Sequence, residues 1–259
     1  MTLTNSLLLK DMRILVTGAA RGIGLALAAE LQRHGARVAL ADIDGTACKV
    51  AALRVPGALA LTMDVTDNAS IERGLFQISQ AFGGLDGLVN NAAVLDDNST
   101  ATISLDRFDQ VLAVNTTSIL RVTQLALPLL AMAGQTSIVN TLSTQSFFGQ
   151  ANSIAYSTAK GAALNLTRSM AVDFAPKGIR VNGVAPGFID TRMAIMASGK
   201  HEHETDWFKS IYVSKRKIPL ARAGTPEDCA GSYVFLLSNL SHYITGQVIT
   251  VDGGLTATY

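Results

Sequence analysis

The chain has 259 residues, of which 48% are hydrophobic, and a formal net charge of +1. This length allows one large core or two small domains. The balanced charge gives no electrostatic reason to expect nucleic acid or an acidic membrane surface as a partner, and no apolar run is long enough to span a membrane. Two cysteines, Cys48 and Cys229, are too few for a disulfide framework or a four-cysteine metal site. We therefore expect a cytoplasmic protein.

Strand-like and helix-like segments alternate from one end of the chain to the other. The expected strands are 12–16, 36–41, 58–62, 86–90, 136–141, 178–184 and 247–251, and the expected helices are 22–34, 68–82, 105–132, 154–175 and 226–237. No Pro/Ser/Gly-rich linker or charge block interrupts them. The pattern predicts a single α/β domain over 1–259, with a doubly wound parallel sheet of about seven strands and helices on both faces.

A glycine-rich turn, Thr17-Gly18-Ala19-Ala20-Arg21-Gly22-Ile23-Gly24, follows the first expected strand and opens the first expected helix. Glycines let the backbone approach a pyrophosphate, and a helix N-terminus supplies amide donors and a favourable dipole. Strand, glycine turn and helix are the context that a phosphate-binding loop requires, although a tight turn without a ligand has the same composition.

Asp42 ends the second expected strand, about 20 residues after the glycine turn. A carboxylate there is placed to accept hydrogen bonds from an adenosine ribose, and its charge would repel a 2′-phosphate. This favours NAD over NADP. Two other interpretations stay open: Asp42 could cap the following segment, and Arg21 could pair with a 2′-phosphate.

Tyr156 and Lys160 lie four residues apart in the expected helix 154–175, so their side chains share one face. An ammonium beside a phenol favours the phenolate and is expected to lower the pKa of the phenol, which makes it a proton donor and acceptor for a carbonyl or alcohol. The pair alone is weak evidence, because this spacing is common in helices.

Together with further motifs in the correct order, these residues resemble the classical short-chain dehydrogenase/reductase family over nearly the whole chain. The further motifs are Asp64-Val65, Asn90-Asn91-Ala92-Ala93, Asn115, Ser143, Arg180-Val181-Asn182 and Pro186-Gly187-Phe188-Ile189-Asp190-Thr191. Ala93 departs from the family, which has glycine there. Either the backbone at Ala93 has ordinary dihedral angles or the turn is mildly strained.

The resemblance implies a Rossmann-type fold and an enzyme that interconverts an alcohol and a ketone with a nicotinamide cofactor, here NAD. It implies Tyr156 as proton carrier, Lys160 as the partner of the tyrosinate and of the nicotinamide ribose, Ser143 as a donor to the substrate oxygen, and Asn115 as the holder of a water that links Lys160 to solvent. The expected cofactor-binding residues are Gly18, Arg21, Gly22, Ile23, Gly24, Asp42, Asp64, Val65, Asn91, Ala92, Ala93, Tyr156, Lys160, Pro186, Gly187, Ile189 and Thr191.

The substrate is a small molecule whose expected contacts are Ser143, Gln145, Ser153, Tyr156, Phe188 and Trp207. The polar side chains among them favour a sugar, polyol or sugar acid, although the phenylalanines could line an apolar pocket. One alternative is reduction of a 3-oxoacyl thioester, which Asp42 disfavours because that reaction normally uses NADPH. Another is a dinucleotide-binding regulator without turnover, against which the complete set of catalytic residues argues.

The segment of about 191–220 has no strand pattern and resembles a lid over the substrate site. Trp207 within it is either a substrate contact or a core anchor. His201 and His203 would point to different faces of a helix, so we expect a solvated surface there and no metal site.

The helix 154–175 carries a small-residue face of Ala155, Ala159, Ala162, Ala163 and Leu166. It fits either packing inside the subunit or the paired helices through which the family forms tetramers, and we expect a homotetramer or dimer.

Overall fold

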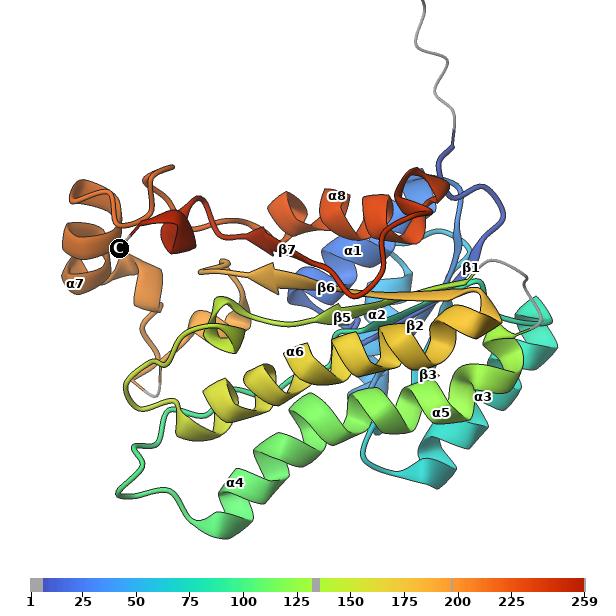
Figure 1. The fold of residues 1–259 in the computed structure, drawn as a ribbon, viewed down its shortest axis with the longest axis horizontal. Coiled ribbons are helices and arrows are strands. Elements are labelled where there is room, and N and C mark those ends of the chain that lie inside the picture. Colours follow the sequence, from blue (N-terminus) through green and yellow to red (C-terminus); the bar gives the residue numbers. More distant parts are fainter. Residues whose placement is uncertain (1–6, 132–135, 197, 259) are drawn as a thin grey trace, which may run out of the picture.

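A seven-stranded parallel sheet forms the centre of the computed structural model, which describes residues 7–131, 136–196 and 198–258 (Figure 1). The strands lie in the order β3-β2-β1-β4-β5-β6-β7, and every neighbouring pair is parallel. Their bounds are β1 Arg13–Thr17, β2 Arg37–Asp42, β3 Leu59–Thr62, β4 Gly87–Asn90, β5 Thr136–Thr141, β6 Ile179–Pro186 and β7 Val248–Val251. The predicted doubly wound α/β fold is confirmed.

Helices cover both faces of this sheet, because parallel strands need crossover connections. On one face, α1 (Gly22–Arg33), α2 (Gly45–Ala52) and α8 (Pro226–Leu237) share a core with one set of strand residues. On the other face, α3 (Asn68–Phe82), α5 (Ser118–Leu130) and α6 (Ile154–Phe174) enclose a second core. The inner strands β1, β4, β5 and β6 are buried on both faces, whereas the edge strands β3 and β7 are mostly half-buried, so the inner strands contain apolar runs rather than a strict alternation.

The order of the strands reverses beside β1, whose neighbours are β2 and β4. In open α/β sheets the loops at the carboxyl ends of the strands diverge at such a point and leave a crevice for a ligand. The glycine turn follows β1, and Asn91 follows β4. The topology therefore places the predicted cofactor residues at the position where this fold binds ligands.

Two local features differ from the prediction. The helix α2 was missed, although Asp44 caps it by accepting a hydrogen bond from the amide of Ala47, a signal that the sequence offered. The expected helix 105–132 is instead divided into α4 (Leu105–Leu112), a π-helical turn Ala113–Thr117 and α5. The π-helical turn contains Asn115, and such turns are frequent at functional sites.

Part of the small-residue face of α6 packs inside the subunit, while Ala162 is exposed and Leu166 is half-buried. Ala155, Ala159 and Ala163 are completely buried in the single chain, so the interpretation that these three pair with another subunit is wrong. They let α6 approach its neighbours within the chain closely instead, and Ala155 and Ala159 form a small core with Val111 of α4. Among the residues that the structure describes, no helix is long and apolar enough to cross a membrane.

Candidate active site

The glycine turn is held against the loop after β4 by Thr17 and Asn91. The Thr17 hydroxyl accepts hydrogen bonds from the amides of Asn91 (3.0 Å) and Ala92 (3.1 Å), and the Asn91 side chain donates to the carbonyls of Thr17 and Gly18. Gly18 has a φ of +63°, and a Cβ there would lie 2.7 Å from the Cα of Ala92. Only glycine permits this approach, which fixes the turn at the end of the sheet.

The N-terminus of α1 is available to an anion. Its N-cap residue, Arg21, forms no side-chain capping bond within the described chain, and the first turn contains no acidic residue. The first amides of a helix have no partner within the helix and favour negative charge. Their orientation toward the glycine turn fits a dinucleotide pyrophosphate.

Asp42 lies at the end of β2 and faces the glycine turn. One carboxylate oxygen accepts from the amide of Ala20 and the other from the amide of Asp44, each at 3.0 Å. The cap of α2 is Asp44, so the interpretation of Asp42 as the cap is wrong. Arg21 pairs with Asp44 at 2.8 Å, which occupies the guanidinium that could otherwise meet a 2′-phosphate.

The other predicted cofactor residues follow the carboxyl edge of the sheet. Thr191 lies against Gly22, and both line a cleft of about 680 Å³ together with Arg21. The Asp64 carboxylate accepts from the amide and hydroxyl of Thr66 after β3. Ala93 is not among the residues with positive φ, so its backbone is ordinary and the substitution of glycine strains nothing. The remaining predicted positions occupy the same edge: Ile23 and Gly24 open α1, Val65 follows β3, Ala92 follows β4, Pro186 ends β6, and Gly187 and Ile189 follow it.

Tyr156 and Lys160 lie on the first turns of α6 and are buried, with exposed fractions of 8% and 2%. The Lys160 ammonium lies 5.6 Å from the centre of the Tyr156 ring. It donates to the carbonyl of Thr141 at the end of β5 over 2.7 Å, and this hydrogen bond fixes its position. The predicted proximity of the two side chains is present.

Burial changes the proton affinity of both groups. The pKa of Tyr156 is raised to about 12, mainly because burial penalises the phenolate, while a hydrogen bond with Ser143 acts in the opposite direction. Burial lowers the pKa of Lys160 to about 8. The expectation that the ammonium lowers the pKa of the phenol is therefore wrong for the protein alone, because desolvation outweighs it. Tyr156 holds its proton at neutral pH.

Ser143 and Asn115 flank this pair. The Ser143 hydroxyl caps the 3-10 turn Thr144–Ser146, accepting from the amide of Gln145 at 3.1 Å. Asn115 is 1% exposed, and its side-chain amide bonds both the amide and the carbonyl of Val94 at 2.8 Å. The π-helical turn therefore anchors the loop after β4 beside α6.

Gln145 and Ser153, two predicted substrate contacts, bond to each other. The Gln145 side-chain oxygen accepts from the hydroxyls of Ser153 and Ser157, each at 2.7 Å, and its amide donates to Gln150. Ser153 is buried. These polar groups brace the loop before α6, and a substrate would have to compete with Ser153 and Ser157 for the Gln145 oxygen.

The lid segment contains short helical turns rather than irregular chain. They are Arg192–Ala194, Glu202–Glu204, α7 (Asp206–Phe208) and the π-helical turn Lys209–Ser214. Phe188, after β6, packs against three lid side chains, with ring centres 5.9 Å from His203, 5.2 Å from Phe208 and 4.6 Å from Tyr212. This aromatic cluster joins the lid to the edge of the sheet.

Phe208, not Trp207, anchors the lid. Phe208 is 1% exposed, whereas Trp207 is 51% exposed and contacts Tyr212 from outside. The interpretation of Trp207 as a core anchor is wrong, and its role as a substrate contact stays a prediction.

We expect Phe208→Ala to lower the free energy of unfolding by about 3–5 kcal/mol, through lost burial and a cavity. Trp207→Ala, the control, should change it by less than about 1 kcal/mol. Urea unfolding followed by circular dichroism measures both, and equal losses would contradict this assignment.

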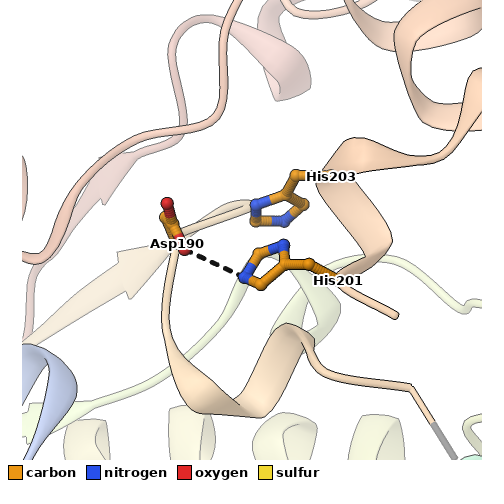
Figure 2. A group of neighbouring side chains, drawn as sticks. All are labelled: Asp190, His201 and His203. Carbon is orange, nitrogen blue, oxygen red and sulfur yellow. Dashed lines mark ion pairs between the residues drawn. The ribbon is translucent and has the colours of Figure 1, made fainter. Parts of the chain in front are cut away.

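His201 and His203 also differ from the prediction. Both are half-buried, and their ring centres are 4.9 Å apart (Figure 2). His201 precedes the 3-10 turn Glu202–Glu204 with extended backbone, so the two residues do not follow the geometry of one regular helix. His201 Nε2 lies 2.9 Å from a carboxylate oxygen of Asp190. The expectation of a solvated surface with histidines on opposite faces is therefore wrong.

Two residues with a part in the site's architecture were missing from the predicted set. Thr17 binds the loop after β4, and Thr141 holds Lys160 through its carbonyl. Thr17 precedes Gly18 at the end of β1, a position that could have indicated its role. A backbone carbonyl leaves no residue-type signal, so Thr141 had none.

Comparisons with known proteins cover almost the whole chain. A family model described as enoyl-(acyl carrier protein) reductase matches residues 18–256. The 2-(S)-hydroxypropyl-CoM dehydrogenase 3 of Xanthobacter autotrophicus is 38% identical, covering 96% of this chain and 98% of its own. A 3-oxoacyl-(acyl-carrier-protein) reductase of Aquifex aeolicus is 37% identical (93% and 96% covered), and the gluconate 5-dehydrogenase of Gluconobacter oxydans is 35% identical (96% of each). The crystal structure of a short-chain type dehydrogenase/reductase from Mycobacterium marinum matches with a TM-score of 0.89 and 32% identity over 98% of this chain and 99% of that one.

Proposed function

The chain belongs to the short-chain dehydrogenase/reductase family of nicotinamide-dependent oxidoreductases, and we propose that it interconverts a secondary alcohol and a ketone with NAD. The observation that carries this proposal is the buried arrangement of Ser143, Tyr156 and Lys160 at the carboxyl edge of the sheet. A protein that only bound the dinucleotide would have no use for a buried ammonium beside a buried phenol.

The chain's own groups supply the proton chemistry. In the reductive direction, Ser143 donates a hydrogen bond to the substrate carbonyl oxygen, and Tyr156 transfers its proton to that oxygen as negative charge develops. Lys160, held by Thr141, then stabilises the tyrosinate. Asn115 holds the adjoining loop, and the water that it is predicted to position would return a proton from solvent through Lys160.

The residues present fit a nicotinamide dinucleotide. The uncapped N-terminus of α1 suits the pyrophosphate, and Asp42 stands where an adenosine ribose would lie. When bound, the cofactor supplies or removes the hydride. Burial of Tyr156 leaves little water at the reacting oxygen, which strengthens each hydrogen bond there.

We expect Asp42 to give a preference for NAD over NADP. One of its carboxylate oxygens accepts from the backbone of the glycine turn, and its negative charge would repel a 2′-phosphate, while Arg21, the basic residue of that turn, pairs with Asp44. Asp42→Ala should lower the ratio of kcat/KM for NAD over NADP by at least about tenfold, roughly 1.4 kcal/mol. Asp44→Ala is the comparison variant, because it removes a neighbouring carboxylate and frees Arg21. It should raise kcat/KM for NADP and leave kcat/KM for NAD unchanged. A wild-type enzyme that prefers NADP would contradict the assignment of Asp42.

For the substrate we propose a sugar, polyol or sugar acid. The similarity to a gluconate dehydrogenase supports it, and so does the polar loop before α6, where the hydroxyls of a substrate could replace the internal hydrogen bonds of Gln145. The alternative, reduction of a 3-oxoacyl thioester, is favoured by the 37% identical reductase and by the description of the matching family. The aromatic cluster around Phe188 offers an apolar wall to either substrate.

A panel of substrates distinguishes these two. The formation of NADH is measured with polyols, sugars and sugar acids, and the consumption of NADH and NADPH with a 3-oxoacyl thioester. The proposal requires the highest kcat/KM among the hydroxylated substrates with NAD. A higher value for the thioester with NADPH would support the alternative instead.

The assembly into a tetramer or dimer and the cytoplasmic location stay predictions.

A further inference from the structure

Three metal-ligating side chains meet where the lid joins the edge of the sheet. Asp190 follows β6, four residues after Pro186, while His201 caps the 3-10 turn Glu202–Glu204 of the lid and His203 lies within it. One ligand atom from each lies within 4.8 Å of the others (Figure 2). Asp190 lies 11 residues before His201 in the chain, so its meeting with the two histidines depends on the fold of the lid.

Two buried nitrogens at this point have no hydrogen-bond partner among the described residues. They are Nε2 of His201 and Nδ1 of His203. His201 Nε2 lies only 2.9 Å from Asp190, but the approach lacks hydrogen-bond geometry. Buried polar atoms are almost always partnered, so such a pair indicates a missing partner.

The chemistry of the ligands points to a transition metal. Two imidazoles and one carboxylate are the ligand set of zinc and its neighbours, whereas calcium and magnesium prefer oxygen alone. Either ring nitrogen of a histidine can bind a metal ion, and Nδ1 of His203 has no hydrogen-bond partner among the described residues.

The geometry needs only a small adjustment. Ligands at about 2.1 Å from a tetrahedral zinc ion are roughly 3.4 Å apart, so the widest pair in the cluster would close by about 1.5 Å. Rotation of an imidazole about its side-chain torsions covers such a distance. The Asp190 side chain is 65% exposed and therefore has room to turn.

We propose that Asp190, His201 and His203 form a binding site for a divalent transition-metal ion such as Zn²⁺. The ion has three protein ligands and an open position for water. The ion joins the lid to Asp190. The next residue, Thr191, lies against Gly22 of the glycine turn. The site thereby couples metal occupancy to the position of the lid, and it does not depend on the proposed substrate.

Metal binding is tested on the full chain after treatment with a chelator. Isothermal titration with Zn²⁺ should give one ion per chain with a Kd of about 1 µM or below, and Co²⁺ should give the visible absorption of a nitrogen- and oxygen-ligated ion. Asp190→Asn and His203→Gln should each weaken Zn²⁺ binding by about 100-fold, because each removes one ligand.

The chain offers a matched control, since its other two histidines are His34 and His242. A His34→Gln/His242→Gln double variant changes the same number of imidazoles and should bind Zn²⁺ like the wild type. Asp190→Asn alters a largely exposed side chain, so it keeps the test valid if His203→Gln does not fold. Hydrogen exchange over 190–205 should slow when Zn²⁺ is added to the wild type but not to Asp190→Asn.

Three results would overturn the proposal. They are no Zn²⁺ binding by the wild type at 100 times the expected Kd, equal binding by the wild type and Asp190→Asn, and loss of binding in the His34/His242 double variant instead. Activity measurements enter none of these arms, so failure of the metal site is distinguishable from failure of the proposed reaction.

Discussion

Replacing Tyr156 with phenylalanine is expected to reduce kcat by about 10²–10⁴, because the variant lacks the group that exchanges a proton with the substrate oxygen. The ring stays in place, since Tyr156 is buried on a helix and only its hydroxyl is removed. Cofactor affinity should change little. Steady-state turnover by NADH absorbance and cofactor binding by NADH fluorescence measure the two effects separately.

Tyr233→Phe is the matched control for this experiment. Tyr233 is also completely buried, and its hydroxyl lies 2.8 Å from the Thr141 hydroxyl, whereas Lys160 uses the Thr141 carbonyl. Loss of that hydrogen bond should cost about 1 kcal/mol of stability and leave most of the turnover. If Tyr156→Phe kept half of the wild-type kcat, or if both variants lost activity equally, Tyr156 would not be the proton carrier.

The raised pKa of Tyr156 also sets the expected pH dependence. With a pKa of about 12 in the protein alone, the phenol holds its proton at neutral pH and is ready to act as an acid. Ketone reduction should therefore need no alkaline pH, whereas alcohol oxidation, which needs the phenolate, should accelerate as pH rises. Rates in both directions from pH 6 to 10 check this difference.

The sequence was sufficient for the sheet because its inner strands are buried on both faces and therefore contain apolar runs. Each predicted strand lies within two residues of the observed one at either end. The missed helix α2 has eight residues, of which only Cys48 and Ala51 are buried, so it offers little periodicity. The interruption at Ala113–Thr117 depends on the contacts of Asn115 with Val94, which lies 21 residues earlier and leaves no local signal.

The candidate site shows a similar division. Ordered motifs predicted Ser143, Tyr156 and Lys160, which the structure brings together at the carboxyl edge of the sheet, while their catalytic roles stay predictions. The direction of the pKa shift of Tyr156 was wrong because it depends on burial, which sequence spacing does not give. The meeting of His201 and His203 with Asp190 depends on the extended backbone at His201 and on contact between the lid and the chain after β6, neither of which a regular helix would give. Local pattern thus predicted the scaffold, and desolvation and long-range contact determined the rest.

Lys160→Met is expected to stabilise the protein at neutral pH while abolishing its turnover. Keeping the buried ammonium charged opposes folding, because burial lowers its pKa from 10.5 to about 8. That difference corresponds to about 3 kcal/mol. Methionine fills a similar volume without charge, but it leaves the Thr141 carbonyl without its hydrogen bond, at a cost of about 1–2 kcal/mol. The charge effect is the larger, so the free energy of unfolding at pH 7 should rise by about 1–2 kcal/mol.

The sign of the effect reverses with pH. Between pH 8 and 10.5 the unfolded wild-type chain binds more protons at Lys160 than the folded chain, so wild-type stability gains from rising pH through that window. Methionine at position 160 does not titrate, so it contributes no such gain in stability. The higher free energy of unfolding of the variant should therefore vanish by about pH 10. The difference between the two proteins isolates Lys160, because the other buried groups, Cys229 among them, titrate in both.

Urea unfolding at pH 7 and pH 10 provides the measurement, with Lys49→Met as the control because Lys49 is exposed on α2. The control should show the same pH dependence as the wild type and keep its turnover. A Lys160→Met protein that is less stable than the wild type at pH 7 would show that the Thr141 hydrogen bond outweighs desolvation of the ammonium. A variant that is both more stable and inactive would show that the buried ammonium lowers stability but is required for turnover. The reaction needs this cation beside the tyrosinate.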